Sequence, residues 1–261
     1  NVFTIMKKIL IGALLLTGCA LPVMACTGIS ATAKDGGYVQ ARTIEWGDSY
    51  LPSQYVVIPC GHEMISYTPK GMNGAKFRAR YGVVGLSIVL KDFVVEGLNE
   101  AGLSAGLFYF PHYGNYPVYD AKQNTRTVAD LQLVAWMLSQ FSTIEEIKAA
   151  MQDIRVVSVD TTGASSTVHW RIGDANGRQV VLEFVDGVPC FYENEIGVLT
   201  NSPGFPWQMT NLNNYVNLYP GGAEAHQLGG VTIFPFGAGS GFQGIPGDVT
   251  PPSRFVRTAF Y

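Results

Sequence analysis

Short runs of apolar and β-branched residues, broken by turn residues, fill the first part of the chain. Residues 26–34 and 38–46 flank Asp35-Gly36-Gly37, a strong turn signal, and predict a β-hairpin. Further strands are predicted at residues 54–60, 63–68, 80–90 and 93–98, followed by a segment of small and aromatic residues at 102–110.

The pattern then changes to a helical spacing of three and four residues. Thr127 is a candidate cap for a first helix, and Thr143 with Glu146 forms a capping-box pattern at the start of a second. The apolar stripe of the first helix is Leu131, Val134, Ala135 and Leu138, and that of the second is Ile144, Ile147, Met151 and Ile154. Both stripes are most simply explained as core contacts with a sheet.

Strand patterns return at residues 167–172 and 179–184 and in a short segment through Cys190 and Tyr192. A last helix is predicted over residues 205–218. The order of strands, helices, strands and helix favours an α+β layered fold over alternating βαβ units.

The first 25 residues have the features of a secretion signal. Lys7 and Lys8 precede an apolar segment at 9–16, which is too short to span a bilayer, and Val23-Met24-Ala25 suits cleavage before Cys26. We therefore expect residues 1–25 to be a leader that is removed, and a periplasmic or secreted protein. Leu16-Thr17-Gly18-Cys19 resembles a lipoprotein processing box, so a lipid anchor at Cys19 stays open as an alternative.

Composition excludes some functions and leaves others open. The net charge is −3 with scattered Lys and Arg, which argues against a nucleic-acid partner. The dispersed His and Cys residues show no metal-ligand spacing, so no metal and no cofactor is expected. Beyond the leader, Cys60 and Cys190 either pair or remain reduced, and the sequence does not decide between the two.

Cys26 carries the most specific chemistry in the sequence. Cleavage after Ala25 would leave it with a thiol and a free α-amine on one residue. The pKa of an ordinary α-amine is roughly 7.7–8.0 and that of a thiol about 8.5. One residue could then supply both a nucleophile and a base near neutral pH.

Five ordered motifs give the chain a resemblance to the choloylglycine hydrolase family, which contains bile salt hydrolases and penicillin V acylases. The motifs are Cys26-Thr27-Gly28, Arg42-Thr43-Ile44-Glu45-Trp46, Asn99-Glu100-Ala101-Gly102-Leu103, Leu199-Thr200-Asn201-Ser202-Pro203 and Pro252-Ser253-Arg254-Phe255-Val256-Arg257. The resemblance implies a four-layer αββα sandwich of the N-terminal nucleophile hydrolase type over residues 26–261. Relatives usually continue past this point, so we expect the C-terminal part of the domain to be missing.

The resemblance also implies roles for individual residues. Cys26 would attack an amide carbonyl, Arg42 would favour its thiolate, and Glu45 would orient the N-terminus at a position where many relatives carry Asp. Asn201 would donate to the oxyanion, and Arg254 would lie near the nucleophile. Without the other motifs, Arg42 would be interpreted as a surface strand residue, Asn201 as a turn residue and Arg254 as half of an ion pair.

Two further residues are expected to contact the substrate. Tyr109 stands where well-known bile salt hydrolases carry Asn and penicillin V acylases carry Tyr, and its backbone N–H could complete the oxyanion hole. Trp46 is a candidate pocket wall, although a core position explains it equally well.

We therefore expect an exported cysteine-nucleophile amidase with a small-molecule amide substrate, such as a conjugated bile salt or penicillin V. An N-acyl homoserine lactone acylase is an alternative within the same chemistry. The alternatives from other classes are a non-catalytic envelope lipoprotein that binds acylated ligands and an inactive remnant. Because family members are often homotetramers, a homotetramer is a further expectation.

Overall fold

The computed structural model describes residues 24–46, 51–159 and 167–261. Its centre is a seven-stranded antiparallel sheet in the order β13-β12-β11-β8-β7-β6-β3. These strands are β3 (Ser53–Ile58), β6 (Val83–Ile88), β7 (Val94–Asn99), β8 (Ser104–Tyr109), β11 (Val168–Gly173), β12 (Gln179–Val185) and β13 (Val188–Glu193). Turns at Asn176-Gly177 and Asp186-Gly187 connect β11, β12 and β13, and both glycines have positive φ.

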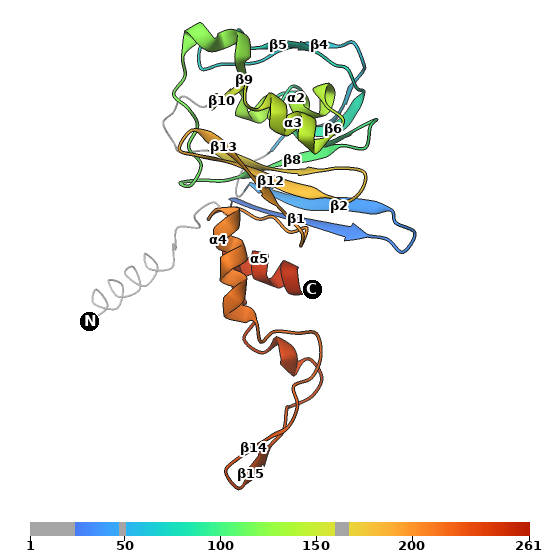
Figure 1. Cartoon of the computed structure of the whole chain (residues 1–261), viewed down its shortest axis with the longest axis vertical. Coiled ribbons are helices and arrows are strands. Elements are labelled where there is room, and N and C mark those ends of the chain that lie inside the picture. Colours follow the sequence, from blue (N-terminus) through green and yellow to red (C-terminus); the bar gives the residue numbers. More distant parts are fainter. Residues whose placement is uncertain (1–23, 47–50, 160–166) are drawn as a thin grey trace, which may run out of the picture.

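Helices α2 (Leu133–Gln140) and α3 (Ile144–Ala150) cover one face of this sheet (Figure 1). The small hairpin of β4 (Glu63–Ile65) and β5 (Lys76–Arg78) packs against α2 at the top of Figure 1. Most of the predicted apolar stripe positions are buried here, and Leu131 and Ile154 are partly buried. Fully buried side chains in this core include Val94, Leu133, Met137, Ile144, Ile147 and Trp170. Thr143 caps α3 by accepting from the N–H of Glu146, which confirms the predicted cap.

The other face of the sheet packs against the predicted hairpin of β1 (Met24–Thr32) and β2 (Tyr38–Trp46). Gly28 permits this approach, because a Cβ atom there would lie 2.7 Å from the ring of Phe108 on β8. Helices α4 (Phe205–Asn211) and α5 (Pro251–Phe260) lie beyond the hairpin (Figure 1). The layers therefore run helices, sheet, sheet, helices, and the predicted αββα sandwich is confirmed.

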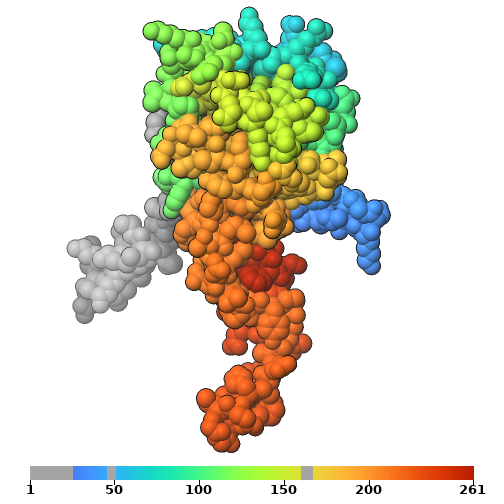
Figure 2. Space-filling model, viewed as in Figure 1, coloured from blue at the N-terminus to red at the C-terminus, as the bar shows by residue number. Residues whose placement is uncertain are grey.

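A long arm leaves the body between α4 and α5 (Figure 2). It ends in a two-stranded hairpin of β14 (His226–Leu228) and β15 (Val231–Ile233), whose residues are all exposed. Backbone hydrogen bonds from Tyr219 to Gly241 and from Gly241 to Gly221 close the base of the arm. After β15, a glycine-rich segment leads the chain from the arm back to the start of α5.

Two helix predictions were wrong in their limits. Thr127 does not cap a helix, because β9 (Thr127–Ala129) pairs in parallel with β10 (Arg155–Val157), and α2 begins only at Leu133. The helix predicted over residues 205–218 ends as an α-helix at Asn211 and continues as a short 3₁₀ turn. Of the helices in the described ranges, none combines the length and apolar character needed to cross a bilayer.

Candidate active site

Cys26 lies on β1 with its side chain toward the core, and the residue is only 6% exposed. Two residues further along, Gly28 forms a backbone bridge with Leu199, with N···O distances of 2.7 and 3.1 Å. This bridge joins segments that are 171 residues apart in the sequence. It places the following residue pair, Thr200 and Asn201, beside Cys26.

The side-chain amide of Asn201 joins two parts of the site. Its oxygen accepts the backbone N–H of Cys26 at 2.9 Å, and its nitrogen donates to the backbone carbonyl of Tyr109 at 2.7 Å. The amide can have only one orientation, because its oxygen faces donors and its nitrogen faces an acceptor. Asn201 is 2% exposed, so its position is fixed on every side.

Arg254 reaches the same point from α5. Its guanidinium donates to the carbonyl oxygen of Cys26 at 2.6 Å, to Oδ1 of Asn201 at 2.8 Å and to the hydroxyl of Thr27. Burial lowers the pKa of Arg254 from its ordinary value, and the nearby charges of Glu45 and Cys26 oppose that shift. An arginine remains cationic under these conditions, so the site has a buried positive charge.

Arg42 shares the sheet-facing side of the hairpin with Cys26. In the register of β1 and β2 it stands opposite Gly28, while Ile44 stands opposite Cys26. Its side chain is 6% exposed. The guanidinium lies 4.0 Å from the ring centre of Phe108 and donates to the carbonyl oxygen of Leu107. The interpretation of Arg42 as a surface strand residue is therefore wrong.

Arg42 pairs with a carboxylate that also binds a second, buried arginine, and neither of these two residues was identified from the sequence. Glu96 on β7 lies 3.6 Å from Arg42 and 3.1 Å from Arg171 on β11. The fully buried Arg171 also donates to the carbonyls of Ile29 and Ala41, one on each strand of the hairpin. The available signal was a charged residue inside the otherwise apolar run of a central strand.

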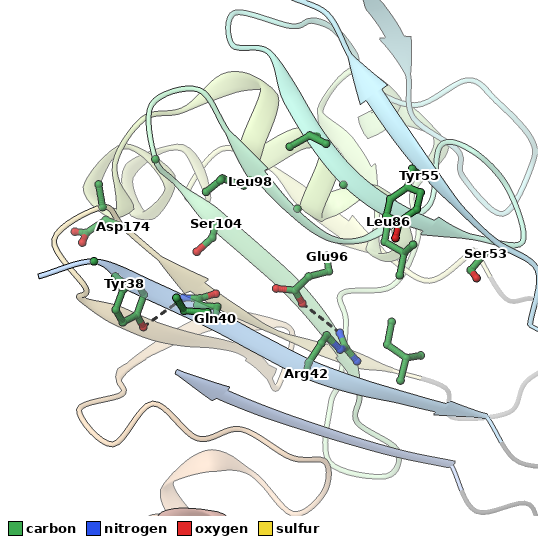
Figure 3. A pocket seen from close by; sticks show the side chains of 18 of the residues that line it. Tyr38, Gln40, Arg42, Ser53, Tyr55, Leu86, Glu96, Leu98, Ser104 and Asp174 are labelled. Atoms are coloured by element: carbon green, nitrogen blue, oxygen red, sulfur yellow. Dashed lines mark hydrogen bonds and ion pairs between the residues drawn. The ribbon is translucent and has the colours of Figure 1, made fainter. Parts of the chain in front are cut away.

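Arg42 and Glu96 both line a cleft with a volume of about 1020 Å³. Figure 3 shows the two side chains facing each other there. The cleft lies between β2 and the open faces of β3, β6 and β7, and Tyr38, Gln40, Tyr55 and Leu86 contribute to its wall. Ile44, which stands opposite Cys26 in the hairpin, lines the cleft. Cys26 itself is not among the described residues that line it. The cleft therefore borders the site at Arg42 and not at the thiol of Cys26.

The remaining predicted residues occupy different positions. Glu45 is exposed on β2, and the peptide N–H of Cys26 bonds to Asn201. The role of Glu45 in orienting a freed N-terminus stays a prediction. Tyr109 ends β8, contributes its carbonyl to Asn201, and has a pKa raised by burial. Trp46 ends β2, and its side chain lies outside the described part of the chain, as do Cys19 and residues 1–23.

Cys60 and Cys190 are both free thiols, so the open question of their pairing is answered. The described residues contain no group of three or more His, Cys, Asp or Glu side chains that could hold a metal ion. His169 is the buried histidine near the site. Both of its ring nitrogens have partners, Glu183 and the carbonyl of Thr200, so the ring does not serve Cys26 as a base.

Comparison with known proteins agrees with this geometry. Residues 26–261 match the family model described as linear amide C–N hydrolases, choloylglycine hydrolase family. The chain belongs to this family. Its reaction is therefore hydrolysis of linear amide C–N bonds.

Individual relatives support the assignment. The chain is 33% identical over 239 residues to a bile salt hydrolase/transferase from Clostridium perfringens, covering 90% of this chain and 71% of that protein. A crystal structure of a mutant conjugated bile acid hydrolase from the same organism gives a TM-score of 0.77 at 31% identity, with the same coverage. The penicillin V acylase from Agrobacterium tumefaciens gives 0.70 at 25% identity, covering 90% of this chain and 64% of that one.

Proposed function

We propose that this amide hydrolase is an exported enzyme that uses Cys26 as its nucleophile after removal of residues 1–25. The observation that carries the proposal is the pair of contacts around Cys26, whose nitrogen bonds to Asn201 and whose carbonyl oxygen bonds to Arg254. Both partners hold the backbone of one residue, and its thiol projects from that fixed backbone. Such preorganisation is typical of a catalytic nucleophile.

In the proposed reaction the sulfur of Cys26 attacks the carbonyl carbon of the substrate. The α-amine, freed by processing, accepts the thiol proton and delivers it to the leaving nitrogen as the C–N bond breaks. A thioester remains on the sulfur. Water then attacks the thioester carbonyl and gives a proton to the α-amine, which returns it to the sulfur as the carboxylic acid departs.

Asn201 would stabilise the negative charge that develops on the carbonyl oxygen. Its NH₂ group has two hydrogens, one of which is used at the carbonyl of Tyr109. The other can point at the substrate oxygen. The buried charge of Arg254 lies beside the same amide and strengthens its polarity, because a nearby cation acts strongly in a low-dielectric site.

We propose a conjugated bile salt as the substrate, because the relatives at 29–33% identity are named as bile salt or conjugated bile acid hydrolases. Penicillin V is the second candidate. A penicillin V acylase from Pectobacterium atrosepticum is 24% identical, and Tyr109 favours this class of acyl group by the resemblance stated above. An N-acyl homoserine lactone presents the same amide and is tested alongside.

The experiment measures amine release from glycocholate, penicillin V and an acyl homoserine lactone by a chain that begins at Cys26. The matched control keeps Ala25 in front of Cys26, with its intact N-terminus verified by mass spectrometry. We expect release from glycocholate only when the α-amine is free. Equal rates in both chains would contradict the role of the amine, and preference for another substrate would revise the substrate class.

The mature N-terminus of protein expressed with its leader separates the enzyme from the lipoprotein alternative. We expect a mass that corresponds to a start at Cys26. A diacylated start at Cys19 would place Cys26 inside the chain and favour the ligand-binding envelope lipoprotein.

A further inference from the structure

Two polar side chains lie in the apolar interior directly behind the active-site segment. His169 on β11 and Glu183 on β12 have side chains that are 0% and 2% exposed. Their nearest atoms, Nδ1 of the ring and Oε1 of the carboxylate, are 3.0 Å apart. A buried polar pair of this kind is often no more stabilising than a well-packed apolar pair, so packing alone does not explain it.

The other contacts of the pair lead to the segment that carries Asn201. The ring nitrogen Nε2 of His169 lies 3.0 Å from the carbonyl oxygen of Thr200. A carbonyl oxygen only accepts, so Nε2 carries a proton and donates it in either protonation state of the pair. Oε1 of Glu183 also accepts the backbone N–H of Phe205 at 2.8 Å. The pair thus holds the segment 200–205 at both ends.

The carbonyl of Thr200 belongs to the peptide group whose nitrogen is that of Asn201. Fixing this carbonyl therefore fixes the plane from which the Asn201 side chain projects. The ring of His169 also stacks on Phe110, with ring centres 4.3 Å apart and an angle of 7°. Phe110 follows Tyr109, whose carbonyl accepts from Asn201. The imidazole therefore contacts two segments: the one that carries Asn201, through Thr200, and the one that accepts the hydrogen bond of the Asn201 amide, through Phe110.

We propose that His169 and Glu183 are positioning residues for amide hydrolysis, which hold the Thr200 peptide so that Asn201 presents its amide at Cys26. This inference rests on the proposed function of Cys26 and Asn201. Small displacements of an oxyanion donor are costly, because stabilisation requires the donor at hydrogen-bond distance from the developing charge. The pair supplies a rigid support of the kind that a catalytic amide needs.

Two substitutions of His169 distinguish its contacts. The amide nitrogen of Gln reaches about as far as Nε2, so His169→Gln keeps a donor for Thr200 and gives up the bond to Glu183. The shorter side chain of Asn places its amide nitrogen only about as far out as Nδ1, so His169→Asn loses the bond to Thr200. We expect kcat for glycocholate hydrolysis to fall about tenfold or more in His169→Asn, with KM little changed, and to stay within about threefold in His169→Gln.

A double-mutant cycle with Asn201→Ala tests whether His169 acts through Asn201. We expect the loss caused by His169→Asn to disappear when Asn201 is already absent, because the amide that it positions has been removed. Trp170→Phe is the matched control, since Trp170 is a fully buried neighbour on β11 that packs into the apolar core between the sheet and helices α2 and α3. It should lower the melting temperature and leave kcat unchanged.

If His169→Asn does not fold, Glu183→Gln replaces it in the cycle, because it keeps the side-chain volume and removes the carboxylate. A kcat loss of about threefold, again confined to chains that contain Asn201, is expected. Losses that are equal in the two His169 variants, or that persist in full without Asn201, would overturn the inference. An inactive wild-type chain would overturn the proposed function and this inference with it, whereas an active wild type with an unimpaired His169→Asn would overturn this inference alone.

Discussion

The side-chain oxygen of Asn201 lies 2.9 Å from the backbone nitrogen of Cys26, although 175 residues separate them in the sequence. The same oxygen accepts a bond from Arg254 at 2.8 Å. One amide therefore connects the proposed nucleophile, the buried cation and, through its nitrogen, the end of β8. Three parts of the chain that are remote in sequence meet at this group.

Asn201→Asp tests the donor role of this amide. The carboxylate would keep the acceptor for Cys26 and Arg254 but would lose the N–H groups and add a negative charge. We expect kcat/KM to fall by about 10²–10³, the usual cost of losing one oxyanion donor. Steady-state hydrolysis of glycocholate measures this, with Asn201→Ala as the comparison. An Asp variant as active as the wild type would show that the amide N–H groups take no part in the reaction.

Arg254→Met should destabilise the fold as well as the site. The substitution removes the donors to the carbonyls of Cys26 and Val249, and it leaves the buried carbonyl of Cys26 without this partner. An unsatisfied buried group costs about 1–3 kcal/mol, so we expect the free energy of unfolding to fall by about that amount. Urea denaturation provides the measurement.

The matched control for Arg254→Met is Arg178→Met. Arg178 makes ion pairs with Glu145 and Glu193 on the surface, where such pairs contribute about 1 kcal/mol or less. Equal losses in the two variants would contradict a special structural role for Arg254.

Gly28→Ala should overpack the contact between the hairpin and the central sheet and destabilise the fold. A Cβ atom at this position would lie 2.7 Å from the ring of Phe108 and 2.9 Å from Nη1 of Arg171, and both side chains are fully buried. We expect a loss of about 1–3 kcal/mol in the free energy of unfolding, as for other overpacked sites. Gly247→Ala meets no atom within 4 Å and should change the stability little. A neutral Gly28→Ala would mean that the hairpin can shift away from β8.

Asp130 should make stability depend on pH. Burial raises its pKa to about 7, and the N–H of Leu131 partly offsets this. Because the folded state holds a proton that the unfolded chain releases above about pH 4, stability falls as the pH rises from about 4 to 7 and is constant above that range. This group contributes a slope of up to about 1.4 kcal/mol per pH unit.

Asp130→Asn removes the titration and should flatten that part of the slope. Urea denaturation of both chains at pH 5.0 and 7.0 measures the difference. A slope that is unchanged in the variant would show that another group is responsible.

Local patterns predicted the hairpin and the helix α3 well, since their signals are contained within a few residues. Asp35-Gly36-Gly37 specifies a turn, and Thr143 caps its helix as the sequence indicates. Thr127 was misassigned because its strand depends on β10, about 28 residues away, and no local signal shows that pairing. Helix α5 was missed even though Thr250 and the following prolines form a recognisable helix start.

The site, too, has residues that the sequence identified and residues that it did not. Cys26, Arg42, Asn201 and Arg254 were named through ordered motifs, and the structure joins Cys26, Asn201 and Arg254 by direct hydrogen bonds. Their proximity depends on the bridge from Gly28 to Leu199, which no periodicity reveals. The sequence did not identify four residues next to the site, because charged or polar residues inside apolar strands reveal their partners only when the sheet is assembled. These residues are Glu96, Arg171, His169 and Glu183.

The most direct test of the central claim is mass spectrometry of protein quenched during turnover of glycocholate, followed by analysis of its N-terminal peptide. The account predicts a mass increase equal to the choloyl group on a peptide that begins at Cys26, and no increase in Cys26→Ala. An adduct on another residue, or amine release at the wild-type rate by Cys26→Ala, would contradict the account.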